Sequence, residues 1–276
     1  AIVRDTVASD QAASRIGYIT MGMAMVPMVA PMIGGLLDEI YDWRASFAMM
    51  LAFGLAAFVL VLFDLGETNR SASASMAAQM CAFPRLLASL PFWGYALTGA
   101  FSMATFFALV GAGPFVATEL LGLRPSEYGL YFGLLSLGYV IGNFVAGRHS
   151  PRIGLDAMML SGNLMAAAGT ALAFALFWLG LGSALALFGP MVLVGVGNGM
   201  TLPNAAAGVV GVRPELAGSA SGLAGSLQLG FAALVSALAG VVVTVETGII
   251  ALLALMLAAA IAAISVSLPL AYKAGR

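Results

Sequence analysis

The chain has 276 residues, of which 62% are hydrophobic and only 8% are charged, and its mean hydropathy is +1.03. Because about a quarter of the residues in a soluble domain are charged, this composition excludes a soluble globular protein. The formal net charge is −1 and no basic cluster occurs, which argues against a nucleic-acid partner. The single cysteine, Cys81, excludes an intrachain disulfide.

Long apolar runs predict eight helices, each close to the ~20 residues that cross a ~30 Å hydrocarbon core. The sequence therefore predicts an all-α, polytopic membrane protein in a lipid bilayer. In chain order, the predicted helices cover residues 17–37, 45–65, 92–117, 128–147, 156–179, 184–211, 216–243 and 248–270.

The charged residues between these helices differ between the two faces of the membrane. Assigning the loops alternately puts nine basic residues on one face and two on the other. Short loops rich in Arg and Lys face the cytoplasm, so we expect a cytoplasmic C-terminus. The nine are Arg4, Arg15, Arg70, Arg85, Arg148, Arg152, Arg213, Lys273 and Arg276; the other face holds Arg44 and Arg124 with Asp38, Glu39, Asp42, Glu119, Glu127 and Glu246.

The longest segment outside the predicted helices, residues 66–91, is rich in Ser and Ala and lies on the predicted cytoplasmic face. Many transporters consist of two repeated helical bundles. We therefore expect residues 1–65 to be the end of an N-terminal six-helix bundle, 66–91 a central linker, and 92–276 a C-terminal six-helix bundle. A chain that begins inside a bundle lacks part of the transport path, so we expect these residues alone not to transport.

Small residues predict where helices approach each other closely, because association in lipid depends on backbone contact. One predicted contact face lies in the helix at 17–37, where Ala30 and Gly34 share an i, i+4 row. A second lies in the helix at 216–243, which carries Gly218, Gly222, Gly225, Gly230 and Gly240.

Two predicted helices carry polar side chains within their apolar sequence. In the helix at 92–117, four polar residues recur at steps of three, four and three, which places them on one face beside an aromatic ring. Such residues either line a water-filled cavity or form hydrogen bonds between helices, and the sequence leaves both open. They are Tyr95, Thr98, Ser102 and Thr105, with Phe101, and in the helix at 184–211 Asn198, Thr201 and Asn204.

The sequence contains no arrangement of residues typical of catalysis or of metal binding. His149 is the only histidine and lies in a predicted loop, so a metal site or a Ser–His relay within the membrane is not expected. Gly195–Asn198 is close to the Gly-x-Gly-Asp pattern of intramembrane aspartyl proteases, but an amide stands where that chemistry needs a carboxylate. We expect neither an enzyme nor a bound cofactor.

The first predicted helix carries Gly17, Ala30-Pro31 and Gly34-Gly35 at a spacing that resembles the span-five signature of drug–proton antiporters in the major facilitator superfamily. Val26 and Ala30 stand where that signature has glycines. Pro31 would bend the helix and the glycines would admit a partner helix. Further strings resemble the bicyclomycin/chloramphenicol-resistance (Bcr/CflA) branch: Arg4-Asp5, Trp43-Arg44, Glu67-Thr68, Gly113–Val116, Pro203–Ala205 and Ala217–Gly222.

The resemblance covers the whole chain. It implies that the eight helices are spans five to twelve, with spans one to three and most of span four absent. It also implies proton-coupled efflux of a small amphipathic drug or xenobiotic by alternating access, carried out by a full-length monomer in the bacterial inner membrane. Spans seven and ten line the central cavity in that fold, which makes the polar residues named above candidates for substrate contact.

The resemblance also places Arg4 near the transport path, although a basic residue there equally anchors the cytoplasmic end of a helix. No acidic residue lies well inside a predicted span, so the residues themselves do not identify a proton site. Two alternatives remain open: a carrier of a small metabolite or amino acid, and a membrane scaffold that transports nothing.

Overall fold

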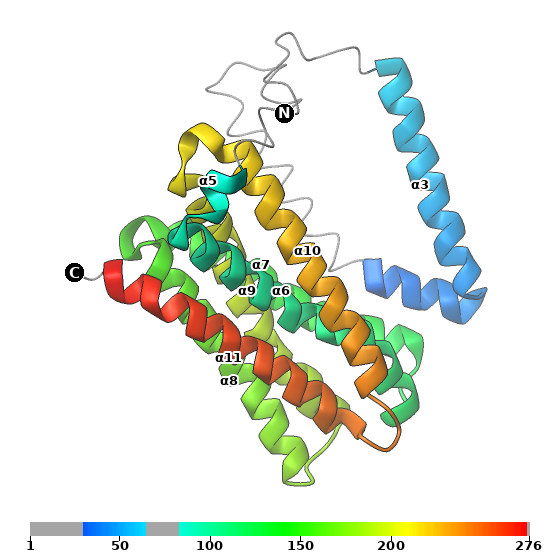
Figure 1. Cartoon of the computed structure of the whole chain (residues 1–276). Coiled ribbons are helices and arrows are strands. Elements are labelled where there is room, and N and C mark those ends of the chain that lie inside the picture. The colour runs from blue at the N-terminus through cyan, green and yellow to red at the C-terminus, as the bar shows by residue number, and fades with distance from the viewer. Residues whose placement is uncertain (1–29, 65–82, 275–276) are drawn as a thin grey trace.

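A computed structural model describes residues 30–64 and 83–274, and the described residues are almost entirely helical (Figure 1). Seven of the described helices are long and apolar enough to cross a membrane. This confirms the prediction of an all-α, polytopic fold. The elements are a helix at residues 30–40, α3 (Trp43–Asp64), α5 (Phe83–Leu87), α6 (Leu90–Phe115), the π-helix η1 (Val116–Leu120), α7 (Pro125–Ile153), α8 (Leu155–Trp178), α9 (Ala184–Val212), the 3-10 helix η2 (Pro214–Leu216), α10 (Ala217–Val242) and α11 (Gly248–Ala274).

Local capping sets the ends of these helices. Pro91 and Pro125 lie in the first two positions of α6 and α7, where a missing N–H costs no hydrogen bond. The Ser183 hydroxyl accepts a hydrogen bond from the Ala186 backbone N–H at 3.1 Å and caps α9. Gly154, at φ 91°, separates α7 from α8. The helix predicted at 128–147 is longer at both ends because these signals lie outside its apolar run.

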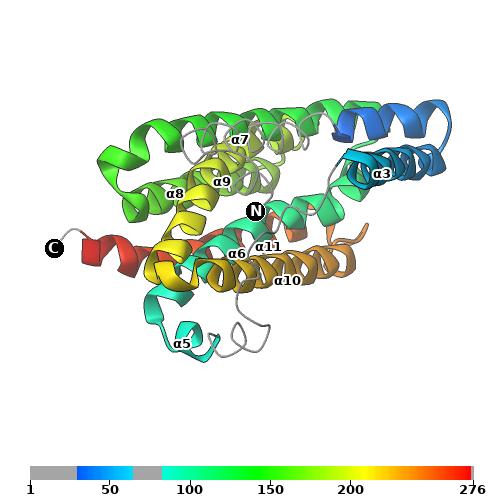
Figure 2. The same cartoon turned by 90° about the horizontal axis from the view of Figure 1, so that it is seen from above.

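Helices α6–α11 pack into one six-helix bundle with an internal symmetry. α9 packs mainly against α7 and α8, and α6 packs mainly against α10 and α11. Figure 2 shows these two groups as separate layers, which are joined by contacts of α6 with α9 and of α8 with α11. Exchanging α6–α8 with α9–α11 leaves this pattern unchanged, as expected for a bundle built from two three-helix repeats.

Backbone contact at glycines holds the α7–α8–α9 layer together. A Cβ added at Gly138 or Gly142 of α7 would overlap a carbonyl oxygen of α9, and one added at Gly195 or Gly199 of α9 would overlap a carbonyl oxygen of α7. The contact face predicted for residues 216–243 is wrong for the part of the chain that the structure describes. There, a Cβ would meet no atom within 4 Å at any of Gly218, Gly222, Gly225, Gly230 and Gly240.

Helix α3 has no buried residue in its most apolar window, and Figure 1 shows it running away from the bundle. Large apolar side chains are exposed along its length, including Phe53 at 70% and Phe63 at 87%. Exposing so large an apolar surface to water is unfavourable, so α3 must be covered by lipid or by further protein.

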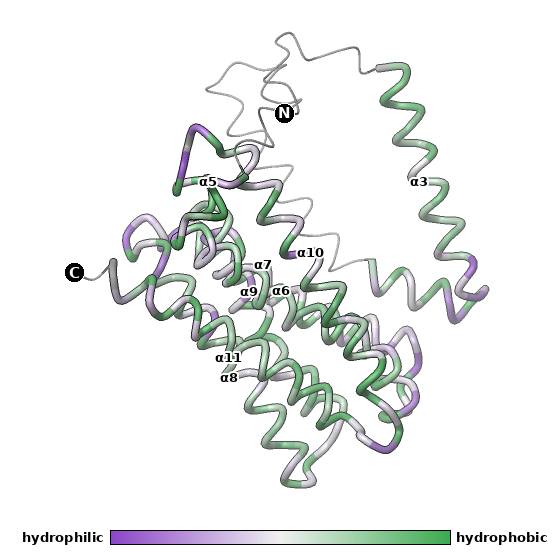
Figure 3. The backbone as a smooth tube through the Cα atoms, viewed as in Figure 1, coloured by the Kyte–Doolittle hydropathy of each residue, from purple (hydrophilic) through white to green (hydrophobic). Residues whose placement is uncertain are grey.

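The hydrophilic segments gather at the two ends of the helices (Figure 3). An ion pair of 3.7 Å between Arg124 and Glu39 joins the last turn of the 30–40 helix to the N-cap of α7, so both lie at the same end. The loops therefore alternate between two ends, as the charge pattern predicts. Arg148 and Arg152 lie in the last turns of α7, and Arg213 directly follows α9, so all three lie at the opposite end, in agreement with the predicted basic face.

Candidate functional site

Ser102 of α6 and Asn198 of α9 meet where the two layers of the bundle touch. The Ser102 hydroxyl donates a hydrogen bond of 2.7 Å to Asn198 Oδ1, and the two side chains are 3% and 2% exposed. This contact joins the two polar sets that the sequence singles out, across 96 positions of the chain.

Two buried polar atoms beside this contact have no partner among the described residues. They are Asn198 Nδ2 and Thr98 Oγ1. Leaving a buried polar group unpaired costs roughly 1–3 kcal/mol. A polar ligand or a water molecule that formed a hydrogen bond with either atom would therefore be stabilised. Thr105 differs, because its hydroxyl donates to the Phe101 carbonyl oxygen at 3.1 Å within the same helix.

Thr201 lies on another face of α9 and belongs to a polar cluster that the sequence analysis missed. Its hydroxyl donates to Asn163 Oδ1 of α8 at 3.2 Å. Asn163 Nδ2 in turn donates to Ser267 Oγ at 3.0 Å and to the Ala263 carbonyl oxygen at 3.3 Å, both on α11. Asn163 is 1% exposed, and Thr201 and Ser267 are fully buried. The cluster therefore ties three helices together.

We expect Asn163→Leu, which keeps a similar volume, to lower the free energy of unfolding by about 2 kcal/mol, because it removes three interhelical hydrogen bonds worth ~0.6 kcal/mol each on average. Asn143→Leu is the matched control, since the one side-chain hydrogen bond of Asn143 within the described residues goes to the Tyr139 carbonyl oxygen of its own helix. Reversible unfolding in mixed micelles compares the two variants. Equal stabilities would show that the Asn163 cluster contributes nothing specific.

Asn204 lines a cavity of about 240 Å³ between the ends of α7 and α9, together with Asn143 and Ser150. The Asn204 amide group donates to the Met200 carbonyl oxygen at 2.6 Å, and its Oδ1 accepts no hydrogen bond from the residues that the structure describes. The Ser150 hydroxyl is buried and has no partner in the described part of the chain. This cavity offers hydrogen-bond acceptors at the end of the bundle that carries Arg148 and Arg152.

The two aromatic residues among the predicted contact residues of α6, Tyr95 and Phe101, pack against neighbouring helices. Tyr95 lies over Gly208 of α9, and its hydroxyl interacts with the carboxyl group of Asp156 at the start of α8. The Phe101 ring meets Phe231 of α10 edge-on, with ring centroids 5.3 Å apart. The eight predicted contact residues thus point in several directions rather than into one cavity, and their roles in binding stay predictions.

The antiporter-like segment is described from Ala30 onward, whereas Gly17 and Arg4 lie outside the described residues. A Cβ added at Gly35 would lie 2.5 Å from the Pro125 carbonyl oxygen, and one added at Gly129 would lie 2.8 Å from the Pro31 carbonyl oxygen. The 30–40 helix therefore packs directly on the first turns of α7, at the acidic end of the molecule.

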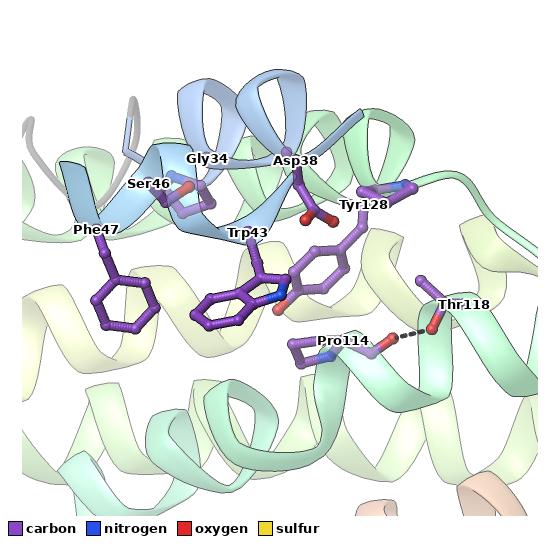
Figure 4. A pocket seen from close by; sticks show the side chains of 11 residues that line it. Gly34, Asp38, Trp43, Ser46, Phe47, Pro114, Thr118 and Tyr128 are labelled. Carbon is purple, nitrogen blue, oxygen red and sulfur yellow. Dashed lines mark hydrogen bonds between the residues drawn. The ribbon is translucent and has the colours of Figure 1, made fainter. Parts of the chain in front are cut away.

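A second cavity, of about 460 Å³, lies at this contact and is called the junction pocket here. One wall comes from the 30–40 helix and the start of α3, and the other from the end of α6, η1 and the start of α7. Figure 4 shows Asp38, Trp43 and Tyr128 turned toward the same space. Thr118, also in the lining, donates its hydroxyl to the Pro114 carbonyl oxygen at 3.0 Å.

Several curated proteins similar to this chain are named for drug resistance. The Bicyclomycin resistance protein homolog of Haemophilus influenzae is 28% identical over 250 residues, which cover 86% of this chain and 60% of the relative. Multidrug resistance protein D of Escherichia coli is 27% identical over 225 residues, covering 82% and 56%. The Chloramphenicol resistance protein of Pseudomonas aeruginosa is 30% identical over 199 residues, covering 71% and 47%. The chain thus spans about half to three-fifths of the length of these relatives.

Solved transporters share the fold. A bacterial homologue of the iron transporter ferroportin in an inward-facing state superposes with a TM-score of 0.70 at 17% identity, covering 98% of this chain and 66% of that one. A bacterial homologue of the human lysosomal transporter Spinster gives 0.66 at 17% identity, covering 99% and 72%. The family model described as Major Facilitator Superfamily matches residues 1–237. The family expected from the sequence is confirmed, and the chain belongs to the Major Facilitator Superfamily.

Proposed function

We propose that the protein exports amphipathic antibiotics and other xenobiotics across the bacterial inner membrane in exchange for protons, with its C-terminus in the cytoplasm. The observation that carries this proposal is the similarity, at 27–30% identity over 199–250 residues, to relatives named for resistance to bicyclomycin, to chloramphenicol and to multiple drugs. Membership of a transporter superfamily favours this function over that of an enzyme.

The mechanism we propose is alternating access, in which two bundles rock about a central site. The α6–α11 bundle is suited to move as one body, because glycine contacts and the Asn163 cluster tie its helices together. At the basic end, Asn143 and Asn204 would accept hydrogen bonds from an entering solute. At the acidic end, contact between the 30–40 helix and α7 would close the path.

Substrate contact deeper in the bundle is proposed for Ser102, Asn198 and Thr98. Asn198 Nδ2 and Thr98 Oγ1 are unpaired donors in the described structure, and a solute oxygen would satisfy them. Reaching them requires α6 and α9 to part, since these side chains are at most 3% exposed. A solute that binds the parted state better than the closed one would shift the population toward it.

The proposal predicts that cells without exporters of their own accumulate severalfold less chloramphenicol when they make the complete gene product that carries these residues. Collapsing the proton gradient should abolish the difference, because an antiporter has no other energy source. Accumulation of the radiolabelled drug, with and without a protonophore, measures both effects.

Other outcomes separate the alternatives. A difference that survives collapse of the gradient would exclude proton drive. Uptake of an amino acid or metabolite in membrane vesicles, without drug export, would indicate a metabolite carrier instead. Normal expression with no solute flux at all would leave a scaffold as the remaining function.

A further inference from the structure

The junction pocket combines a carboxylate, aromatic rings and an apolar lining. From this combination we propose that it binds a monovalent organic cation with a flat apolar body. Its placement at the outer end of the transport path rests on the proposed function, whereas binding itself follows from the residues described below.

The charge of this end of the molecule favours a cation. Asp38 lines the pocket and has no ion-pair partner among the described residues. The nearby arginines are already paired: Arg44 lies 3.2 Å from Asp42, and Arg124 lies 3.7 Å from Glu39 and 3.3 Å from Glu127. Neither arginine lines the pocket. The Asp38 carboxylate is therefore available to neutralise a ligand.

The aromatic side chains supply the second element of a cation site. Trp43, Phe47 and Tyr128 line the pocket, and the rings of Trp43 and Tyr128 lie beside the Asp38 carboxylate (Figure 4). The face of an aromatic ring attracts a cation within about 6 Å of its centre. The Arg44 guanidinium lies 4.8 Å from the centre of the Trp43 ring, so this indole already interacts with a positive charge.

The size and lining of the pocket define the ligand further. Its volume of about 460 Å³ falls in the range of roughly 300–1,000 Å³ that holds drug-sized molecules. Pro31, Pro114 and the aromatic rings make most of the lining apolar. A small hydrated metal ion would need several oxygen ligands, and the pocket offers it a single carboxylate. An organic cation matches both the charge and the apolar wall.

The pocket also depends on the conformation, because its two walls come from segments on either side of residues 65–82. It exists only while the 30–40 helix and the start of α3 contact the ends of α6 and α7. A ligand that binds this arrangement alone stabilises it. An organic cation should therefore favour the conformation in which the acidic end is closed.

The test measures binding of N-methylquinolinium to the purified 276-residue chain by equilibrium dialysis, with quinoline as the neutral comparison. Because a cation gains both the carboxylate and the ring faces, we expect it to bind about tenfold more tightly than quinoline. Asp38→Asn should remove this preference, and Asp38→Glu should restore most of it. Glu119→Gln is the matched control: Glu119 is exposed next to Thr118, lies outside the pocket lining and has no ion-pair partner among the described residues, so its loss should leave the preference unchanged.

Fluorescence then locates the ligand. The chain contains three tryptophans, and Trp93→Phe with Trp178→Phe leaves Trp43 as the only one. N-Methylquinolinium should quench this residue, and Asp38→Asn should weaken the quenching. Equal affinities for the cation and for quinoline, full cation binding by Asp38→Asn, or no quenching of Trp43 would each overturn the proposal. Binding is measured without transport, so a failure of drug export by the complete gene product would contradict the proposed function alone.

Discussion

We expect Gly142→Ala to lower the free energy of unfolding of the bundle by about 3 kcal/mol, the upper end of the usual cost of overpacking. The new Cβ would overlap the carbonyl oxygen of Val196 and lie 2.8 Å from its carbonyl carbon. These are backbone atoms inside α9, so no side chain can rotate away. The helices α7 and α9 would have to separate, and every other contact between them would weaken. Reversible unfolding in mixed micelles measures the change.

Two glycines of the same helix provide matched controls. At Gly133 and Gly147 an added Cβ meets no atom within 4 Å. Alanine is favoured over glycine in a helix by up to ~1 kcal/mol, so Gly133→Ala and Gly147→Ala should leave the bundle unchanged or slightly more stable. If Gly142→Ala had the same free energy of unfolding as these two variants, the close packing of α7 on α9 would be excluded.

This contrast shows what the sequence could and could not predict about packing. Gly138 and Gly142, Gly195 and Gly199, and Gly218 and Gly222 all have the same i, i+4 spacing. The first two pairs lie against a neighbouring backbone, while the α10 pair contacts nothing among the described residues. Spacing places glycines on one face of a helix, but the rotation of each helix in the bundle decides what that face meets. The apolar runs predicted the seven membrane-capable helices that the structure describes, but they carry no information about the rotation of each helix.

For the polar residues too, local spacing predicted the helix face but not the partner. Steps of three and four correctly placed Thr98, Ser102 and Thr105 on one buried face of α6. The partner of Ser102 is 96 residues away and depends on tertiary structure. Asn163 and Ser267 were missed although each is a polar residue within an apolar span, which is a signal in itself. Their partners, like the partner of Ser102, lie on other helices and could not be read from local spacing.

The junction pocket could not be predicted from the sequence, for a different reason. The residues that form it lie in two segments on either side of residues 65–82, and each segment looks ordinary alone. In the sequence, Asp38 is one of several acidic residues between predicted helices, and Trp43 is typical of an aromatic residue at a membrane boundary. Contact between the 30–40 helix and α7 brings them together, and small residues at Gly35 and Gly129 make that contact possible.

We expect Gly35→Ala to reduce drug export by the complete gene product about tenfold. The added Cβ would lie 2.5 Å from the carbonyl oxygen and 2.9 Å from the carbonyl carbon of Pro125. The 30–40 helix would then no longer seat on α7, and the conformation closed at the acidic end would lose about 1–3 kcal/mol, which corresponds to a 5–150-fold shift in population. Accumulation of radiolabelled chloramphenicol at matched expression levels measures export.

Gly34→Ala is the control, one residue away on the same helix. Its Cβ would meet only the Ser46 hydroxyl oxygen at 3.9 Å, an ordinary contact, so export should persist. A loss shared by both variants would indicate that glycine is needed here for helix flexibility and not for contact with α7. Retention of export by Gly35→Ala would show that closure of the acidic end does not require this contact, and alternating access would then need another gate.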